Sequence, residues 1–501
     1  MKPLLAGVDL GTSSLKAGLY SPNGERLALQ RVPYPLHAPQ PGWAEQDPAD
    51  WWAAAVQALR VVAAAAEGAG GAIAALGLAG QCPGHVLLGR ESEALGRAII
   101  WRDQRATAEA AWLGEHISGE DAARWTGLNQ LAQATLPPAR LLWLKAHRAD
   151  DWAATQVVLQ PKDYLAFKLT GAVLTDINSA YALAHPSPPH YAADYLAALG
   201  IAPGSLPPLS PAHGVAGRVT PEAARATGLP AGLPVIIGTI DAFCDLLGSG
   251  AVEPGLAVDV AGTSEMIGLA VGAATAGEGV FAASLDGRLN FLCGPTQAGG
   301  DALRWLAQGF FPELNWATGH PALEQAAASC PPGSAGLLFL PYLDGERAPI
   351  WDPQARAAFI GLTLAHGRAH CARAVYEGVA FAARHVLERC ETTSGQPARQ
   401  VHVCGGGARS EFWNQLKADV FNRPVVAADI EAACLGAAAL AAAGIGLQPT
   451  TAAAARKLAA ARQTYRPRPE AATVYEQAFG LYRELYPALR PAYGRLAALT
   501  A

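Results

Sequence analysis

Two stretches of the chain place an acidic residue before a Gly-Thr-Ser turn. Residues 7–20 read GVDLGTSSLKAGLY and residues 257–271 read AVDVAGTSEMIGLAV, with apolar residues on both sides of each turn. Glycine permits a tight turn whose backbone N–H groups can point at one anion, and the Thr and Ser hydroxyls add donors. Two such turns, about half a chain apart, predict that the phosphates of one nucleotide are held from both sides.

The first turn consists of Gly11, Thr12 and Ser13, and Asp9 precedes it. A carboxylate that ends a strand beside a phosphate-binding turn can hold hydrated Mg²⁺, which bridges phosphate oxygens. Asp9 is therefore a candidate metal ligand through water and a candidate catalytic residue. Lys16 could add positive charge for the nucleotide, although a lysine that faces water from a strand is the more common arrangement.

A third glycine-rich stretch, Cys404-Gly405-Gly406-Gly407, lies between an expected strand and an expected helix. Glycines there let the backbone approach a flat or charged ligand, and the N-terminus of the helix adds a favourable dipole. The same residues could equally form a tight connection that binds nothing. Neither G-x-G-x-x-G after the first strand nor G-x-x-x-x-G-K-[ST] occurs as a coherent unit, which excludes the Rossmann and P-loop nucleotide sites.

These residues must be positioned by strands and helices, and the sequence alternates between the two. A helix is expected at 51–66, after the N-cap Asp47 and Pro48, and another at 410–421; the Pro-rich stretch 186–211 is expected to be a surface connection. The expected strands are 4–9, 16–20, 26–31, 73–78, 99–101, 235–238, 257–260, one starting at 266, and 400–404. The alternation indicates α/β architecture, and the restart of the pattern predicts a domain boundary near 245.

Composition narrows the class of protein. A chain of 501 residues is too long for one core, and 51% hydrophobic with 16% charged residues argues against disorder. A net charge of −5 gives no basic stripe, so no nucleic-acid partner is expected, and no apolar stretch approaches a membrane span. The eight cysteines show no C-x-x-C spacing, which is typical of reduced thiols in a cytoplasmic protein.

Several longer segments resemble the FGGY family of carbohydrate kinases, within the actin-like ATPase superfamily, and among them the xylulokinases. The resemblance covers nearly the whole chain, in order. It is carried by GWAEQDPADWW at 42–52, LQPKDYL at 159–165 with LTG at 169–171, PYLDGER at 341–347, WDP at 351–353 and FIGL at 359–362.

The resemblance implies two actin-like (ribonuclease H-like) domains with mixed sheets flanked by helices, closing on a central cleft. Residues 1–245 would bind the sugar and carry the first phosphate loop. Residues 246–501 would bind ATP, and their terminal helix could pack back on the first domain. The implied cofactors are ATP and Mg²⁺, and the implied reaction is transfer of the γ-phosphoryl group to a sugar hydroxyl.

Individual site residues follow from the same resemblance. Asp241 matches the catalytic aspartate, and one carboxylate that accepts the proton of the sugar hydroxyl suits a loose phosphoryl-transfer transition state. Asp245 lies four residues on, where a helix-capping or solvent-facing side chain is the more common arrangement. The nucleotide positions are Gly262 and Thr263 in a second phosphate loop, Gly300 and Arg304 near the nucleotide, and Gly405, Gly406 and Ser410 in an adenosine-binding loop.

Two departures from the xylulokinase pattern concern the acceptor. The family's Gln-Met-His-Gly is replaced by Gln81-Cys82-Pro83-Gly84, and Pro83 cannot donate a hydrogen bond to the sugar. Ala242 stands where xylulokinases often carry Asn. Gln81 and Asp103, which follow expected strands of the first domain, are the better candidates for holding the sugar. His85 could reach the sugar or could be structural.

The sequence thus predicts ATP-dependent phosphorylation of a ketopentose, D-xylulose to D-xylulose 5-phosphate, with Asp241 as the general base. One alternative is a kinase of another pentulose, a tetrulose or a polyol. A second is a sugar-responsive binding or regulatory protein without turnover, and a third is a chaperone-like ATPase indifferent to sugar. The expected partner is a small sugar, and the resemblance leaves room for a homodimer.

Overall fold

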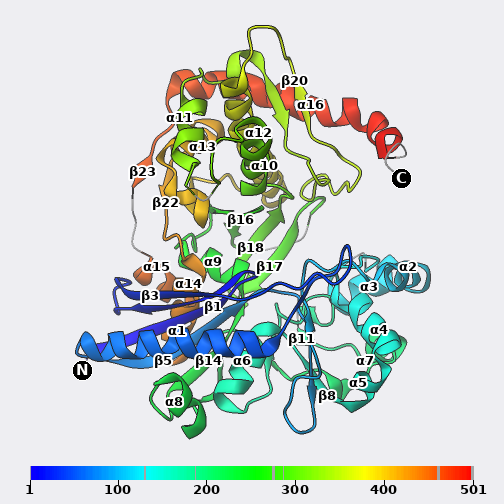
Figure 1. Cartoon of the computed structure of the whole chain (residues 1–501), viewed down its shortest axis with the longest axis vertical. Helices are drawn as coiled ribbons and strands as arrows, with labels where there is room; N and C mark the ends of the chain where they lie inside the picture. Colours follow the sequence, from blue (N-terminus) through cyan, green and yellow to red (C-terminus); the bar gives the residue numbers. More distant parts are fainter. Residues whose placement is uncertain are drawn as a thin grey trace. The chain divides into compact units, whose positions relative to one another are not determined.

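The structure is a computed structural model that describes residues 2–128, 131–186, 188–273, 277–285, 287–316, 318–459 and 463–497. They form two compact units (Figure 1). The first contains the chain up to Gly248 together with Ala433–Leu458, and the second contains Ser249–Ala432 with the chain from Ala459 on. Each unit is built around one mixed sheet with helices, as the alternating pattern predicts.

The sheet of the first unit has the order β13-β14-β5-β1-β2-β3. The hairpin β1–β2 and the neighbour β3 are antiparallel, whereas β5 and β14 continue the sheet in parallel. The strands predicted at 4–9, 16–20 and 26–31 are therefore confirmed and form an antiparallel meander. The strands are β1 (Lys2–Leu10), β2 (Ser14–Tyr20), β3 (Arg26–Pro33), β5 (Gly71–Gly80), β13 (Val215–Arg218) and β14 (Pro234–Ile240).

The sheet of the second unit repeats this arrangement, in the order β17-β18-β16-β15-β21-β22-β23. Here β15 pairs antiparallel with β16 and parallel with β21, as β1 does with β2 and β5. The two Gly-Thr-Ser turns thus occupy the same place in two similar sheets. The strands are β15 (Leu256–Ala261), β16 (Glu265–Val271), β17 (Phe281–Leu285), β18 (Leu289–Pro295), β21 (Gln400–Cys404), β22 (Val425–Ala427) and β23 (Thr464–Tyr465).

The helix α1 (Pro48–Gly68) covers β2 and β3 of the first sheet. Asp47 caps its N-terminus by accepting a hydrogen bond from the Ala49 N–H at 2.9 Å, and proline occupies the first helical position, as predicted. Its buried face includes Trp51 and Val62, which join the core of this unit. The helix therefore fixes the hairpin that carries the first turn.

A helix from late in the chain, α14 (Ala432–Gly444), packs directly on the first sheet. A Cβ on Gly7 of β1 would lie 1.9 Å from the Cys434 carbonyl oxygen, and one on Gly77 of β5 would lie 1.9 Å from that of Ala437. Only glycine allows backbones to approach so closely. Figure 1 shows α14 and α15 (Thr451–Leu458), in orange, beside the blue strands of the same unit.

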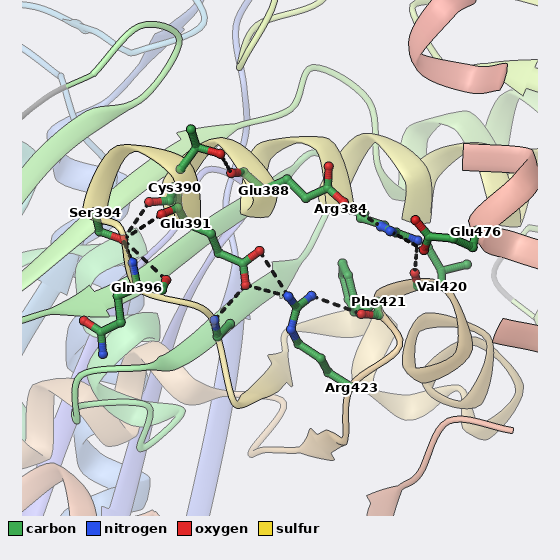
Figure 2. A network of polar contacts seen from close by, with 12 residues as sticks. Arg384, Glu388, Cys390, Glu391, Ser394, Gln396, Val420, Phe421, Arg423 and Glu476 are labelled. Atoms are coloured by element: carbon green, nitrogen blue, oxygen red, sulfur yellow. Dashed lines mark hydrogen bonds and ion pairs between the residues drawn. The ribbon is translucent and has the colours of Figure 1, made fainter. Parts of the chain in front are cut away.

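The terminal helix α16 (Pro469–Ala497) belongs to the core of the second unit through Tyr475, Phe479 and Tyr482. Polar contacts add to this packing (Figure 2). Arg384, on α12 (Arg368–Ser394), donates to the Val420 carbonyl of α13 (Glu411–Phe421) at 2.9 Å and pairs with Glu476 of α16 at 2.6 Å. A late segment, Ala433–Leu458, belongs to the first unit, and packing of the terminal helix on the first domain stays a prediction.

The stretch 186–211 is more ordered than a surface connection. It contains α7 (Ala193–Leu199), because Tyr195, Leu196 and Leu199 lie on one face and are buried in a local core.

No helix among the described residues is long and apolar enough to cross a membrane. The other helices are α2 (Thr107–His116), α3 (Gly119–Thr126), α4 (Pro137–His147), α5 (Ala149–Ala154), α6 (Pro161–Thr170), α8 (Pro221–Thr227), α9 (Asp241–Gly248), α10 (Gly300–Phe310) and α11 (His320–Ala328). The short paired strands are β4 (Glu45–Gln46) with β7 (Ala98–Ile99), β6 (Val86–Gly89) with β8 (Thr155–Leu159), β9 (Thr175–Asp176) with β12 (Leu209–Ser210), β10 (His185–Pro186) with β11 (Pro189–His190), and β19 (Leu338–Leu340) with β20 (Ala358–Ile360).

Candidate active site

The turn Gly11-Thr12-Ser13 is held in place by side chains from other segments. Gln46 Nε2 donates to the Thr12 carbonyl at 2.6 Å, and Trp101 Nε1 donates to Thr12 Oγ1 at 2.8 Å. Gln81 Nε2 donates in turn to Gln46 Oε1 at 2.7 Å. The candidate phosphate turn and the candidate sugar residue Gln81 are therefore linked through one buried amide.

Asp9 and Lys16 face each other across the β1–β2 ladder. The carboxylate of Asp9 is buried at 4% exposure, and Lys16 Nζ lies 3.3 Å from its Oδ2 atom. The Lys16 side chain is only 20% exposed and lies against Asp9, so the prediction that this lysine faces water is wrong. Its ammonium group lies beside the first turn, where it can contribute positive charge.

Two further carboxylates lie near Asp9. Asp241 is the first residue of α9, and burial, followed by the negative charge of Asp9, raises its pKa to about 7. Asp245 is partly buried, and burial together with Asp9 and Asp241 raises its pKa well above the ordinary value. The N–H of Ala433, in the first turn of α14, donates to Asp245, so a capping role describes this side chain better than exposure to water.

This group of residues fits a hydrated magnesium ion better than a fully coordinated one. In the described part of the chain no three His, Cys, Asp or Glu residues are arranged to hold a metal ion by themselves. Mg²⁺ usually keeps several water ligands and takes one or two carboxylates together with substrate phosphates. A single buried carboxylate, Asp9, beside a turn that can bind phosphate is consistent with that mode of binding.

The candidate sugar residues Gln81, Cys82 and Pro83 follow β5 directly, and the Cys82–Pro83 peptide bond is cis. Gln81 is 1% exposed, and its Oε1 atom accepts no hydrogen bond from any described residue. The Cys82 thiol donates to the Ser179 carbonyl at 3.8 Å. Asp241 is among the charges that raise the pKa of this thiol, after burial and Asp176, so Cys82 lies near the candidate base.

Asp103, the other candidate for holding the sugar, has both carboxylate oxygens engaged. It is fully buried, and its Oδ2 atom accepts from the Ala44 N–H at 2.6 Å and from Arg105 Nη2 at 2.7 Å. Its Oδ1 atom accepts from the Arg105 N–H at 3.0 Å. A sugar contact by Asp103 stays a prediction, and the sugar would share these oxygens with Arg105.

The sequence did not single out Arg140, a fully buried residue of α4 beside these segments. Its guanidinium group donates to three carbonyl oxygens, those of Pro83 at 3.2 Å, Trp101 at 2.6 Å and Asp103 at 3.1 Å. An arginine at a position that apolar neighbours bury is the signal that could have found it. His85 is 1% exposed, and burial and Arg140 lower its pKa well below the ordinary value, so it is a neutral interior residue.

The second turn, Gly262-Thr263-Ser264, is packed against the start of α10. The Gly299 N–H donates to the Thr263 carbonyl, and the Gly300 N–H donates to that of Gly262, both at 2.9 Å. A Cβ on Gly300 would lie 2.9 Å from the Gly262 carbonyl oxygen, so the close approach requires glycine here. The structure thus brings together three of the residues predicted to bind the nucleotide.

The glycine-rich stretch after β21 adjoins the same turn. Gly405 has φ of 77°, and a Cβ on it would lie 2.9 Å from the Ala261 carbonyl oxygen. Gly406 begins a short 3₁₀ turn, and the Ser410 hydroxyl caps α13 by accepting from the Trp413 N–H at 3.0 Å. Arg304 lies on the exposed side of α10 and pairs with Asp301.

Comparison with known proteins shows which proteins this chain is similar to. The profile "FGGY family of carbohydrate kinases, N-terminal domain" matches residues 4–248, and the corresponding C-terminal profile matches residues 257–445. Xylulose kinase from Bacillus subtilis is 31% identical over 493 residues, 96% of each chain. Gluconokinase from the same organism is 29% identical and covers 88% of this chain and 87% of its own. The crystal structure of xylulose kinase from Rhodospirillum rubrum aligns with a TM-score of 0.88 at 32% identity, over 98% of this chain and all of the other.

The chain therefore belongs to the FGGY family of carbohydrate kinases. The expected fold, with sheet-rich, actin-like domains flanked by helices, is confirmed. The prediction that the chain is a carbohydrate kinase is confirmed as well.

Proposed function

We propose that the protein transfers the γ-phosphoryl group of ATP to the terminal hydroxyl of D-xylulose, giving D-xylulose 5-phosphate and ADP. The observation that carries this proposal is the grouping of Asp9, Lys16 and Asp241 beside the first Gly-Thr-Ser turn. Such a group has what phosphoryl transfer needs: a base, a charge that can hold a cation, and donors for phosphate. The similarity to xylulose kinases supports D-xylulose as the acceptor.

In this proposal Asp241 is the general base. Its carboxylate accepts the proton of the acceptor hydroxyl as the oxygen attacks the γ-phosphorus atom, and ADP leaves. A pKa of about 7, caused by burial and by Asp9, leaves a large part of the group ionised at neutral pH while strengthening it as a proton acceptor. Asp9 would hold Mg²⁺ through water, and the ion would neutralise phosphate charge.

The nucleotide would be held by residues of both units. The Thr12 and Thr263 hydroxyls and the backbone N–H groups of the two turns would bind phosphate oxygens, and Lys16 would add charge. The remaining proposed contacts are Gly11, Ser13, Gly262, Gly300, Arg304, Gly405, Gly406 and Ser410. The proposed acceptor contacts are Gln81, Cys82, Pro83, Asp103 and Asp241.

The roles of the two units follow the same proposal. The first unit would bind the acceptor and the second would bind ATP, with the change between these roles near residue 245. A cytoplasmic location and a homodimer stay predictions.

Gluconate is a second candidate acceptor, because a relative of similar identity is named gluconokinase. Pro83 and Ala242 also leave other pentuloses, tetruloses and polyols open, since each replaces a residue that could bond a sugar hydroxyl. The test is kcat/KM for ATP-dependent ADP release with each of these acceptors. A preference for gluconate or a polyol over D-xylulose would change the proposed acceptor, and the proposed phosphoryl transfer from ATP would stand.

The Asp241→Asn variant tests the base. We expect kcat to fall by about 10² to 10⁴ fold, with the Kd for ATP unchanged. Asp245→Asn is the matched control, because Asp245 lies one turn further along α9 and also faces Asp9. Near-native turnover by Asp241→Asn would reject the assignment, and ADP release without any acceptor would favour a sugar-independent ATPase. Binding of sugar and nucleotide without ADP release would favour a regulatory protein.

A further inference from the structure

Three buried charged side chains lie behind the second Gly-Thr-Ser turn. Lys417 Nζ lies 2.5 Å from Asp259 Oδ2 and 2.6 Å from Glu265 Oε1. All three side chains are at most 1% exposed. We call Lys417, Asp259 and Glu265 the Lys417 cluster. Buried carboxylates of this kind require a charge partner, and Lys417 supplies it to both.

The Lys417 cluster joins the two loops that the proposed function assigns to the nucleotide. Asp259 lies on β15 and Glu265 on β16, on either side of the turn. Lys417 lies on α13, the helix that follows the Gly405-Gly406-Gly407 stretch. Its ammonium group therefore connects the phosphate hairpin with the helix behind the proposed adenosine loop.

The two similar sheets supply a cation to the hairpin in different ways. In the first unit Asp9 lies opposite Lys16 in the β1–β2 ladder, so the hairpin carries its own cation. In the second unit Asp259 lies opposite Ile267. Since the hairpin has an apolar residue at that position, the cation comes from α13, and the turn depends on that helix for charge.

The charge behind the second Gly-Thr-Ser turn affects how strongly the turn can bind a phosphate group. Two ionised carboxylates directly behind an anion-binding turn would repel a phosphate group, and the repulsion is weakly screened in the interior. Lys417 offsets one of these charges. Burial, then Asp259, raises the pKa of Glu265 to about 8, against the opposing effect of Lys417 and with a contribution from Glu346. The Glu265 carboxyl therefore loses its proton at a higher pH than an exposed glutamate does, and its negative charge then adds to that of Asp259.

We propose that Lys417 is a positioning residue for ATP, which holds the Gly262-Thr263-Ser264 turn against α13 and neutralises the acidic residues behind it. The inference rests on the proposed function, because it assumes that this turn binds the phosphates of ATP. It assigns Lys417 no contact with the nucleotide. Its effect should therefore appear in the affinity for ATP and not in the affinity for the acceptor.

The first test is a double variant, Lys417→Met with Asp259→Asn, which removes the Lys417–Asp259 ion pair and leaves Glu265 as the remaining carboxyl of the cluster. We expect the Kd and KM for ATP to rise about tenfold, a change of about 1.4 kcal/mol, with the KM for the acceptor unchanged. The matched control is Arg373→Met with Glu377→Gln. That pair, 2.7 Å apart, is also buried in the second unit but lies on α12 and bonds to Ser334, Cys330 and Tyr475. The control should lose stability and keep its affinity for ATP.

The second test is the pH dependence of ATP binding by calorimetry. In the native chain we expect the Kd to rise about fivefold between pH 7 and 9 as Glu265 ionises, and Glu265→Gln should remove this rise. The charged groups that face Glu265 are Asp259, Lys417 and Glu346, and the variant leaves all three in place. If the double variant does not fold, this measurement decides by itself.

The outcomes separate the inference from the proposed function. Native ATP affinity in the double variant, or an equal pH dependence in Glu265→Gln and the native chain, would overturn the positioning role while ATP binding stands. An equal loss of ATP affinity in the control would also overturn it, because the effect would then follow from stability alone. A native chain that binds no ATP would overturn both.

Discussion

The side chains around Asp9 carry more negative than positive charge. Besides burial, Asp9 raises the pKa of Asp241 and of Asp245, Asp241 also raises that of Asp245, and the positive charge of Lys16 lowers both. Such an excess of carboxylates is costly in the absence of a cation and favours binding of Mg²⁺. The second unit also has a group of buried carboxylates near its turn, formed by Asp259, Glu265 and Glu346. The effect of Glu346 can be measured as a change in the stability of the protein.

Glu346 should make the protein less stable as the pH rises. Burial raises its pKa from 4.5 to about 7, so the folded state binds this proton more tightly than the unfolded state does. The stabilisation that this tightly held proton gives is therefore fully present below pH 4.5 and is lost as the pH rises to about 7, with a loss on the order of 3 kcal/mol. Glu346→Gln should melt at a higher temperature than the native chain at pH 8 and at about the same temperature at pH 4.

The glutamine can keep the bonds that Glu346 makes now, because its oxygen can accept from the N–H groups of Gln297 and Arg347, at 2.6 and 2.8 Å in the native chain. Glu470→Gln, at an exposed position on α16, is the control and should change neither melting temperature. A Glu346→Gln variant less stable than the native chain at pH 8 would show that the carboxylate is a net stabiliser there.

Among the elements, α14 packs backbone to backbone on several partners. Its backbone touches β1 and β5 at Gly7 and Gly77, and a Cβ on Gly436 of α14 would lie 1.9 Å from the Cys244 carbonyl of α9. The helix therefore lies against both the sheet that carries Asp9 and the helix that carries Asp241. A displacement of α14 should affect the positions of both carboxylates.

Gly77→Ala tests this packing. The new methyl group would overlap a backbone carbonyl that cannot move without shifting α14, so we expect a loss of about 3 kcal/mol, measured by chemical denaturation. Gly480→Ala, in α16, is the matched control, because no atom lies within 4 Å of its added Cβ. It should gain about 0.5 to 1 kcal/mol from helix propensity. Equal effects of the two substitutions would contradict the close approach.

The sequence predicted the strands and turns well, because these depend on local patterns. The Asp47 cap, the hairpin around Gly11 and the restart near Asp259 are all short-range features, and each is found in the structure. The packing of α14 could not be predicted, since its Ala-rich sequence fits many environments and its partners lie more than 180 residues away in the chain. The Lys417 cluster could not be predicted either, because Lys417 lies 158 residues from Asp259 and 152 from Glu265 in the chain.

The whole molecule has separate cores in its two units, with residues such as Leu59 and Val235 in one and Val375 and Phe479 in the other. Because each unit buries its own apolar residues, we expect calorimetry to resolve two unfolding transitions. ADP should raise the midpoint of one of them and the acceptor sugar that of the other, each by mass action.

The Gly77→Ala variant identifies the transitions, because it should lower only the one that the sugar raises. A single transition that both ligands shift equally would mean that the units unfold together. A shift of the same transition by both ligands, with the other unmoved, would contradict the division of binding between the units.

The return of Ala433–Leu458 to the first unit also has a consequence for synthesis on the ribosome. The six strands of the first sheet have all emerged by Ile240, yet the helix that covers Gly7 and Gly77 is translated only after most of the second unit. The nascent first unit therefore exposes an apolar sheet face for the whole of that interval, and a chaperone that recognises such faces would have its longest opportunity to bind there.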